Sequence, residues 1–286
     1  MKPVRKAVFP VAGLGTRSLP ATKSIPKEML TVVDRPLIQY AVEEAREAGI
    51  EQMIFVTGRG KGALDDHFDI SFELEATMNA RGKSLEPLSG TRSTPGSVVS
   101  VRQQEPLGLG HAVWCARDII GDEPFAVLLP DDLMVGKPGC VAQMVEAYNK
   151  VGGNIICVQE VPRERTASYG VITPGSADGR LTEIKGLVEK PKPEVAPSNL
   201  AVVGRYILQP EVMRILDAKE TGAGGEIQLT DAMAKLIGTQ PFHGLTFDGD
   251  RHDCGDKIGF VLANIALGLD REDVGPAIRA YVANIG

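Results

Sequence analysis

Cysteines, aromatic residues and long apolar runs are scarce in this sequence of 286 residues. The four cysteines, Cys115, Cys140, Cys157 and Cys254, form no CxxC pair. This spacing indicates neither a zinc site nor a disulfide framework, so we expect free thiols in a reducing cytoplasm. No run reaches the ~20 apolar residues that a membrane helix needs. The apolar run near the N-terminus is also too short for a signal peptide, so we expect no membrane partner.

An excess of positive charge is missing as well. The sequence has 31 Lys and Arg residues against 37 Asp and Glu residues, a net charge of −6. A general nucleic-acid binder needs a basic face, so this balance argues against that class but leaves room for a local basic pocket. Charged residues make up 24% and hydrophobic residues 43% of the chain, which is typical of a globular protein and excludes a disordered one.

Strand-length apolar runs alternate with helix-period segments in the first half of the chain. We expect strands at residues 7–11, 52–57, 97–103, 125–129 and 154–161, and helices at 38–48, 63–80, 110–120 and 141–151. Such alternation predicts a Rossmann-like α/β fold, with a mixed, mostly parallel sheet flanked by helices. Ligands of such sheets bind at the carboxyl ends of the strands, which is where the unusual residues of this sequence cluster.

The pattern of expected secondary structure changes after Pro162. Strand-like pieces at 170–173, 181–185, 186–189 and 201–208 are separated by Gly and Pro turns, and helices are expected at 210–218, 228–237, 256–269 and 275–284. We therefore expect one domain with three parts: residues 1–160, residues 161–255 and C-terminal helices at 256–286. The last helix has an apolar stripe that packs either on the core or on another subunit. The polar segment 81–96 is expected to be a long mobile loop.

The first chemical signal is a glycine loop, Gly13-Leu14-Gly15-Thr16, directly after the first strand. Glycines allow backbone N–H groups to approach phosphate oxygens. The loop lacks the lysine and spacing of a Walker A motif and the third glycine of a dinucleotide fingerprint, so taken alone it is equally consistent with a structural turn. Three cations, Arg17, Lys23 and Lys27, lie within eleven residues of each other in an acidic protein. They favour a phosphate site over a solvated loop.

Two of these motifs, GLGTR at 13–17 and PKEML at 26–30, resemble the signature of the sugar nucleotidyltransferases, which make nucleotide sugars from a sugar 1-phosphate and a nucleoside triphosphate. The resemblance continues in order along most of the chain, in HFDISFELE at 67–75, GLGHAV at 108–113, LLPDDL at 128–133, YGVI at 169–172, VEKP at 188–191, GEIQLTD at 225–231 and HDCGDK at 252–257. It is most similar to the bacterial branch that uses UTP and glucose 1-phosphate. The thymidylyl branch typically has GGSGTR and Gly-Asp-Asn, where this chain has Ala12-Gly13-Leu14 and Pro130-Asp131-Asp132.

The resemblance implies a nucleotide-diphospho-sugar transferase fold with a nucleotide-binding half, a smaller sugar-binding β portion and C-terminal helices. It implies transfer of UMP from UTP to glucose 1-phosphate, with UDP-glucose and pyrophosphate as products and Mg²⁺ as cofactor. It also implies a homodimer or homotetramer that assembles through the C-terminal helices. Independently of the family, Asp131 and Asp132 follow a buried strand, where carboxylates suit Mg²⁺ that bridges phosphates; a helix cap or turn is the alternative.

Residue roles are carried over from the family position by position. The nucleotide contacts would be Ala12, Gly13, Leu14, Gly15, Thr16, Glu28, Gln103 and Gly108. The sugar contacts would be Gly170, Glu189, Lys190 and Gly204. Arg17, Lys27, Asp131 and Lys190 would be catalytic, and Asp131 and Asp253 would hold the metal. Outside the resemblance, Gln103, the Glu189-Lys190 pair and the glycines are equally consistent with ordinary surface and turn residues.

Other functions stay open at this point. Thymidylyl, cytidylyl or adenylyl transfer needs the same phosphate machinery, and uracil differs from thymine by one methyl group, which gives only weak discrimination. Gly224 stands where thymidylyltransferases tend to carry an arginine. A non-catalytic nucleotide-sugar sensor on the same fold is a further alternative, but it should have lost the cations and acids that are present here. The broken fingerprint argues against a dinucleotide-dependent oxidoreductase.

Overall fold

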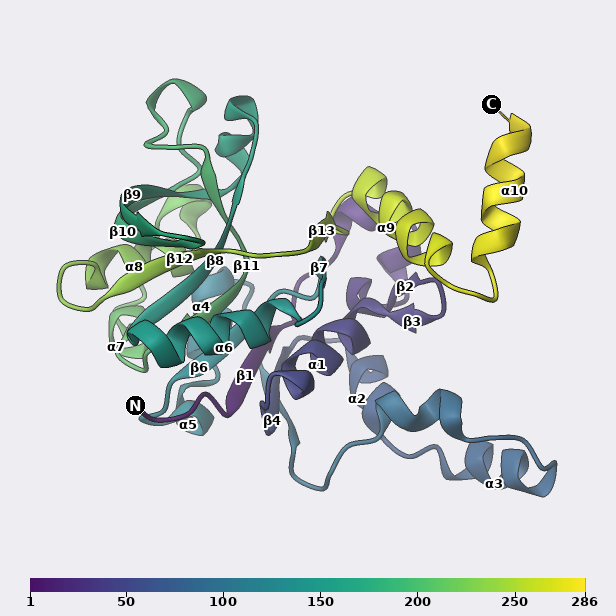
Figure 1. The fold of residues 1–286 in the computed structure, drawn as a ribbon. Coiled ribbons are helices and arrows are strands. Elements are labelled where there is room, and N and C mark those ends of the chain that lie inside the picture. Colours follow the sequence, from purple (N-terminus) through teal and green to yellow (C-terminus); the bar gives the residue numbers. More distant parts are fainter. Residues whose placement is uncertain (286) are drawn as a thin grey trace.

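A computed structural model describes residues 1–285 and shows a central nine-stranded sheet (Figure 1). The strands are β1 (Lys6–Pro10), β4 (Gln52–Thr57), β5 (Val98–Arg102), β6 (Phe125–Leu128), β8 (Asn154–Glu160), β9 (Gly170–Asp178), β10 (Leu181–Glu189), β11 (Leu200–Leu208) and β12 (Phe242–Thr246). Their order is β5-β4-β1-β6-β11-β8-β12-β10-β9. The strands β5, β4, β1 and β6 run parallel, whereas β11 is antiparallel to β6, β8 and β9. The sheet is therefore mixed, and the expected α/β class is confirmed.

Alternation along the strands sends apolar side chains to both faces of the sheet. In β1, Ala7 and Phe9 enter one buried cluster and Val8 enters the other. The first cluster is covered by α1 (Leu37–Glu47), α2 (Gly62–Phe68) and α6 (Cys140–Val151), and the second by α4 (Leu109–Trp114), α5 (Arg117–Ile120), α7 (Val212–Asp217) and α8 (Leu229–Leu236). Burial on both faces explains why the strands read as nearly continuous apolar runs.

A buried ion pair fixes α1 against the carboxyl end of β6. The guanidinium of Arg205 on β11 donates to both carboxylate oxygens of Glu44 at 2.8–3.2 Å and to the backbone oxygen of Leu129 at 2.9 Å. Both side chains are buried, and an unpaired charge at such a depth would be strongly unfavourable. The pair thus ties together the elements from which Pro130, Asp131 and Asp132 emerge.

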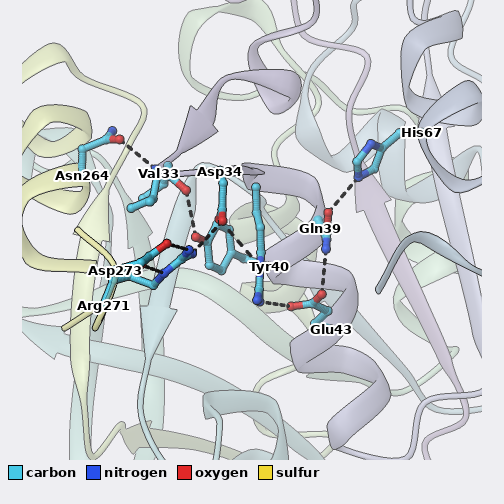
Figure 2. A network of polar contacts seen from close by, with 11 residues as sticks. Val33, Asp34, Gln39, Tyr40, Glu43, His67, Asn264, Arg271 and Asp273 are labelled. Carbon is cyan, nitrogen blue, oxygen red and sulfur yellow. Dashed lines mark hydrogen bonds and ion pairs between the residues drawn. The ribbon is translucent and has the colours of Figure 1, made fainter. Parts of the chain in front are cut away.

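Two small antiparallel ladders lie beyond the main sheet. One joins β2 (Thr31–Val32) to β3 (Arg35–Pro36), and the other joins β7 (Asp132–Val135) to β13 (Asp250–Asp253). Helix α9 (Lys257–Leu269) packs on both through a third apolar cluster that includes Val32, Leu133 and Ala263. Figure 2 shows the polar contacts around this junction, where Asn264 Oδ1 accepts from the backbone N–H of Val33 at 2.9 Å and Arg271 pairs with Asp34 at 2.7 Å.

Several local expectations are corrected by the structure. The helix expected at 63–80 is broken at residues 69–71 into α2 and α3 (Phe72–Ala80), and the helix expected at 110–120 is split into α4 and α5. The pieces at 181–185 and 186–189 form one strand, β10. Segment 81–96 contains a 3-10 helix at Glu86–Thr91 and is hydrogen-bonded to Arg46 through Gly90 and Ser93, so it is not a structureless loop.

Other expectations agree with the structure or are extended by it. All four cysteines are free thiols. Among residues 1–285 there is no helix long and apolar enough to cross a membrane. The division at residue 160 is not visible as a gap, because β8 from the first half lies between β11 and β12 from the second. The terminal helix α10 (Gly275–Ile285) projects away from the body of the molecule (Figure 1), and Tyr281, Val282 and Ile285 of its apolar stripe are exposed.

Candidate active site

The glycine loop follows β1 and lies against the cation-bearing segment that comes after it. Gly15 has a φ of 66°, and a Cβ there would lie 3.0 Å from Lys27 Cβ and 3.2 Å from Thr22 Cγ2. A side chain at this position would be both strained and crowded. The hydroxyl of Thr22 also donates to the Gly15 carbonyl at 2.7 Å. The loop is thus folded over Lys27, so GLGTR and PKEML form one unit.

A cavity of about 370 Å³ opens beside this loop. Its walls are Pro10, Ala12, Gly13, Leu14, Gly15, Thr16, Gln103, Pro106, Gly108, Leu109, Ala112 and Glu226. Seven of the eight expected nucleotide contacts are in this set; Glu28 is not. Gly108 has a φ of 107°, and a Cβ there would lie 2.8 Å from both Glu226 Cβ and the Ile227 carbonyl, so only glycine fits. Glu226, to which no sequence motif gave a role, also lines the cavity.

Two carboxylates from distant parts of the chain converge next to the loop. Asp131 follows β6, and Asp253 ends β13. A Cβ on Gly255 would lie 3.1 Å from Asp131 Oδ2 and 3.0 Å from Asp253 Oδ1. The glycine therefore leaves a small space that both carboxylates face. The backbone N–H of Cys254 donates to the Asp131 carbonyl at 2.7 Å, which holds the two segments together.

We call Asp131 and Asp253 together the acidic corner. Lys27 offsets the negative charge of this corner through its ion pair with Asp131. Its Nζ lies 2.6 Å from Asp131 Oδ2. Burial alone would raise the pKa of Asp131, but the ammonium of Lys27 outweighs it and holds that pKa below its usual range. Burial likewise lowers the pKa of Lys27, and the charges of Asp131 and Glu28 more than reverse the effect. Both side chains are therefore ionised at neutral pH.

The donor set at Gly255 fits a magnesium ion. Mg²⁺ is usually held by one or two carboxylates together with substrate phosphates and water, and seldom by a cage made of protein alone. Asp131 and Asp253 provide two such carboxylates around an open space.

Arg251 is a part of the site that the sequence motifs did not indicate. Its guanidinium bonds Asp132, with Nε 2.7 Å from Oδ1, and lies 3.7 Å from Asp253 Oδ2. The Tyr169 hydroxyl donates to the same Asp253 oxygen at 3.4 Å. Burial opposes protonation of Arg251, but the Asp132 carboxylate prevails and raises its pKa. Arg251 thus keeps neighbouring carboxylates from repelling each other and fixes the direction of Asp253.

The expected sugar contacts gather on β9, β10 and β11. Gly170 pairs with Glu189 in the β9–β10 ladder, and a Cβ on Gly170 would lie 3.3 Å from Glu189 Oε2. Lys190, just after β10, has its Nζ 3.4 Å from Glu189 Oε1 and a half-exposed side chain. The backbone N–H of Gly204 donates to Asp132 Oδ2 at 2.8 Å. The structure therefore places Gly204 in direct contact with Asp132. Gly170, Glu189 and Lys190 lie on or just after neighbouring strands, all in the part of the chain after residue 160.

A second, larger cavity of about 890 Å³ meets this corner and shares no wall residue with the first. Arg17 and Asp253 line it, together with Arg165, Tyr169, Arg251 and Lys257. Arg17 directly follows Thr16 of the first cavity, so consecutive residues at the end of the glycine loop belong to the walls of the two cavities. Unlike Lys27, Arg17 has no ion pair within the described residues, and its charge faces open space.

Glu28 is placed differently from the other expected nucleotide contacts. It is 1% exposed and pairs with the buried Lys61 at 2.8 Å. Burial raises the pKa of the Glu28 carboxyl despite this neighbour. Glu28 is therefore held inside the protein by Lys61, its negative charge favours the charged form of Lys27, and it does not line the 370 Å³ cavity.

Comparison with known proteins agrees with this geometry. The family model for nucleotidyl transferase matches residues 6–265, and the chain belongs to the nucleotidyl transferase family. In particular, it is 60% identical over 260 residues to a Komagataeibacter xylinus protein named UTP–glucose-1-phosphate uridylyltransferase, covering 90% of this chain and 92% of the relative.

Solved structures give the same likeness. A UTP-bound UGPase from Acinetobacter baumannii has a TM-score of 0.90 and 43% identity, covering 99% of this chain and 100% of that one. A UDP-glucose pyrophosphorylase complexed with UDP-glucose has a TM-score of 0.84 and 44% identity, covering 94% and 100%. The resemblance to sugar nucleotidyltransferases that the motifs carry is thereby confirmed at the level of the family.

Proposed function

We propose that this protein transfers UMP from UTP to glucose 1-phosphate and releases pyrophosphate, giving UDP-glucose. The observation that carries this proposal is the 60% identity over 260 residues to a relative named for that reaction. The site supports it, because a cavity of nucleotide size adjoins a corner where cations and carboxylates converge.

The reaction needs one in-line displacement. An oxygen of the sugar phosphate attacks the α-phosphorus of UTP, the new P–O bond forms, and the bond to the bridging oxygen breaks as pyrophosphate leaves. The attacking phosphate is already ionised at pH 7, so no general base is required. The protein's contribution is to bring two polyanions together and to stabilise the charge of the transition state.

Roles for this chain's own residues follow from their positions. The base would pack on Ala12, Gly13 and Gly108 and hydrogen-bond to Gln103. Leu14, Gly15 and Thr16 would surround the ribose and phosphates. Arg17 and Lys27 would bind the leaving phosphates, and Lys190 would hold the attacking phosphate while Gly170, Glu189 and Gly204 contact the glucose ring. On this assignment residues 1–160 form the nucleotide-binding half and residues 161–255 the sugar-binding half.

Asp131 and Asp253 would hold the Mg²⁺ ion expected in this family. Bound there, the ion would supply positive charge next to the substrate phosphates. Lys27, whose Nζ lies 2.6 Å from Asp131 Oδ2, would add a second positive charge beside the same phosphates.

The test is pyrophosphate release with glucose 1-phosphate and Mg²⁺, run in parallel with UTP, dTTP, CTP, ATP and GTP. We expect a strong preference for UTP and loss of activity with EDTA. A preference for dTTP would keep the mechanism and overturn the substrate. Absence of release with every nucleotide and with other sugar 1-phosphates would favour a non-catalytic sensor.

We further propose that the protein is a homo-oligomer in which α9 and α10 form the contact. Apolar side chains on both helices are exposed in the single chain, namely Ile258, Val261, Leu262, Ile265, Tyr281, Val282 and Ile285. Exposed apolar side chains gathered in this way are typical of a protein–protein contact. The cytoplasmic location expected from the cysteines stays a prediction.

A further inference from the structure

The hydrogen bonds around the Gln103 amide determine which of its two ends can face a base. The side-chain Nε2 of Gln103 lies 3.1 Å from the Gly108 carbonyl oxygen and 3.1 Å from Nδ1 of His111. A carbonyl oxygen can only accept, so the end of the amide that faces Gly108 must be the NH₂ group. With both of its hydrogens engaged by Gly108 and His111, this group has none left for a ligand. Gln103 is part of the wall of the 370 Å³ cavity, and its remaining polar atom is the acceptor Oε1.

This arrangement requires one particular form of His111. The imidazole must be neutral and must carry its proton on Nε2, so that Nδ1 can accept from Gln103. The surroundings favour that form. His111 is buried, and its ring stacks on Trp114 with centroids 5.6 Å apart. Burial lowers the pKa of His111, and the positive charge of Lys219 acts in the same direction.

Opposing influences on His111 come from one neighbour. The backbone and the carboxylate of Glu105 both raise the pKa of the ring, but burial and Lys219 outweigh them. The other charged side chains that line the pocket beside His111 are Arg102 and Arg117, whose positive charges oppose protonation of the ring. The net effect is a neutral ring at pH 7.

We propose that His111 is a positioning residue for base selection, which holds Gln103 so that only an acceptor is presented to the base. This inference rests on the proposed function and goes beyond it, because it names what makes a uracil-type base preferred. Uracil and thymine carry an N–H at position 3, which can donate a hydrogen bond to Gln103 Oε1. In cytosine the nitrogen at position 3 carries no hydrogen and is itself an acceptor, so two acceptors would face each other. A mismatch of a directed polar group is penalised more strongly than the loss of an apolar contact.

Two substitutions test the proposal. Asn in place of His111 keeps an acceptor near the position of Nδ1, whereas Phe keeps the ring and its stacking on Trp114 but has no acceptor. We expect His111→Phe to lower the ratio of kcat/KM for UTP to that for CTP by about tenfold, the value of one net hydrogen bond. His111→Asn should stay within about threefold of the wild type. The dTTP-to-CTP ratio should fall in parallel, because thymine has the same N–H.

A base-selection role and a merely structural role give different results. A structural defect would lower activity with UTP and CTP together and leave their ratio unchanged, which would overturn the proposal. Equal losses of the ratio in the Asn and Phe variants would overturn it too. If the wild-type protein binds UTP but does not turn it over, the proposed function fails while calorimetric affinities for UTP and CTP still test His111.

A measurement on the wild-type protein needs no variant. Protonation of His111 converts Nδ1 into a donor that faces the Gln103 NH₂ group, which destroys the arrangement. Because the pKa of His111 is lowered, the ring should charge only below its ordinary titration range. We expect the UTP-to-CTP ratio to be constant from pH 7 to 8 and to fall as the pH is lowered through the titration of the His111 ring, which NMR can follow in the same protein. The ratio cancels the titration of the phosphates, which both nucleotides share. A ratio that is constant across the His111 titration, or a fall that follows the protonation of free CTP instead, would contradict the proposal.

Discussion

At the scale of single residues, Arg17 and Lys27 differ in what a bound phosphate must replace. Lys27 is ion-paired with Asp131 at 2.6 Å, whereas Arg17 has no ion pair within residues 1–285. A phosphate that reaches Lys27 competes with a carboxylate, so its attraction is partly offset. A phosphate that reaches Arg17 loses no protein partner and gains a planar, two-pronged donor. Arg17 is thus suited to initial capture, and Lys27 to the charge that develops later.

The Asp131 carboxylate should be essential for metal-dependent turnover. Asp131→Asn keeps the size of the side chain but removes the charge that pairs with Lys27 and faces Gly255. We expect kcat to fall by about 10²–10³, the usual effect of removing one preorganised electrostatic group, and the Mg²⁺ concentration for half-maximal pyrophosphate release to rise. The control is Asp118→Asn, at a side chain that is 84% exposed. Turnover near the wild-type rate would exclude Asp131 as a metal ligand.

Lys190 should act on the sugar phosphate and not on the nucleotide. Its half-exposed ammonium lies beside Glu189, just after the end of β10. We expect Lys190→Ala to raise KM for glucose 1-phosphate at least tenfold, since a charge-assisted bond is lost, and to change KM for UTP little. Lys185→Ala, on the exposed part of β10, is the matched control. Equal changes in both KM values would contradict the assignment.

At the scale of elements, α9 connects Asp253, a proposed metal ligand, with the segment that carries Lys27, a proposed phosphate-binding residue. This helix begins just after Asp253, and Asn264 in its middle bonds the backbone of Val33, a few residues after Lys27 (Figure 2). Val33 has a φ of 59°, an unusual conformation for a β-branched residue. A turn strained in this way persists only where its surroundings hold it, and Asn264 supplies that restraint.

Loss of this restraint should affect both stability and catalysis. We expect Asn264→Ala to lower the free energy of unfolding by about 1–2 kcal/mol, because the Val33 N–H loses its partner, and to reduce kcat without a selective change in either KM. Arg271→Ala, which removes the more exposed contact with Asp34, should have a smaller effect on a urea melt. A larger effect for Arg271 than for Asn264 would show that the exposed ion pair holds the junction.

How much the sequence could predict depends on the distance along the chain between partners. The wall of the cavity beside the glycine loop was largely predictable, because most of it comes from two short segments at 12–16 and 103–108. Arg251 was not, since its main partner Asp132 is 119 residues away and a single arginine before HDCGDK has no local signal. The helix expected at 63–80 failed for a local reason: its apolar positions continue through Asp69–Ser71, where the backbone turns away from the helix. The nucleotide contact carried over to Glu28 from the family stays a prediction, and nothing in the sequence indicated its buried pair with Lys61, 33 residues away.

At the scale of the whole molecule, one continuous sheet carries both proposed substrate sites. The first-half strand β6 and the second-half strand β11 are hydrogen-bonded neighbours, with Leu128 opposite Arg205. Asp131 leaves the end of β6, and Gly204 on β11 bonds Asp132. The proposed nucleotide and sugar sites therefore meet at one strand pair within one continuous sheet. This rigid junction suits a reaction that depends on the alignment of two phosphates.

The C-terminal helices α9 and α10 should form the contact between the subunits of the proposed oligomer. Tyr281 is 67% and Ile258 is 73% exposed, and burying such side chains against a second copy gives roughly 1.5–3 kcal/mol each. We expect an oligomer by sedimentation at micromolar concentration and a shift toward monomer in Tyr281→Asp, because a carboxylate would be buried without a partner. Val195→Asp, at an equally exposed apolar residue outside these helices, is the control. A monomeric wild-type protein, or dissociation by both variants alike, would contradict assembly through α9 and α10.

Since Ile258 and Leu262 also line the cavity that contains Arg17 and Asp253, a dissociated variant should also show a changed KM for substrates, which a remote contact would not produce.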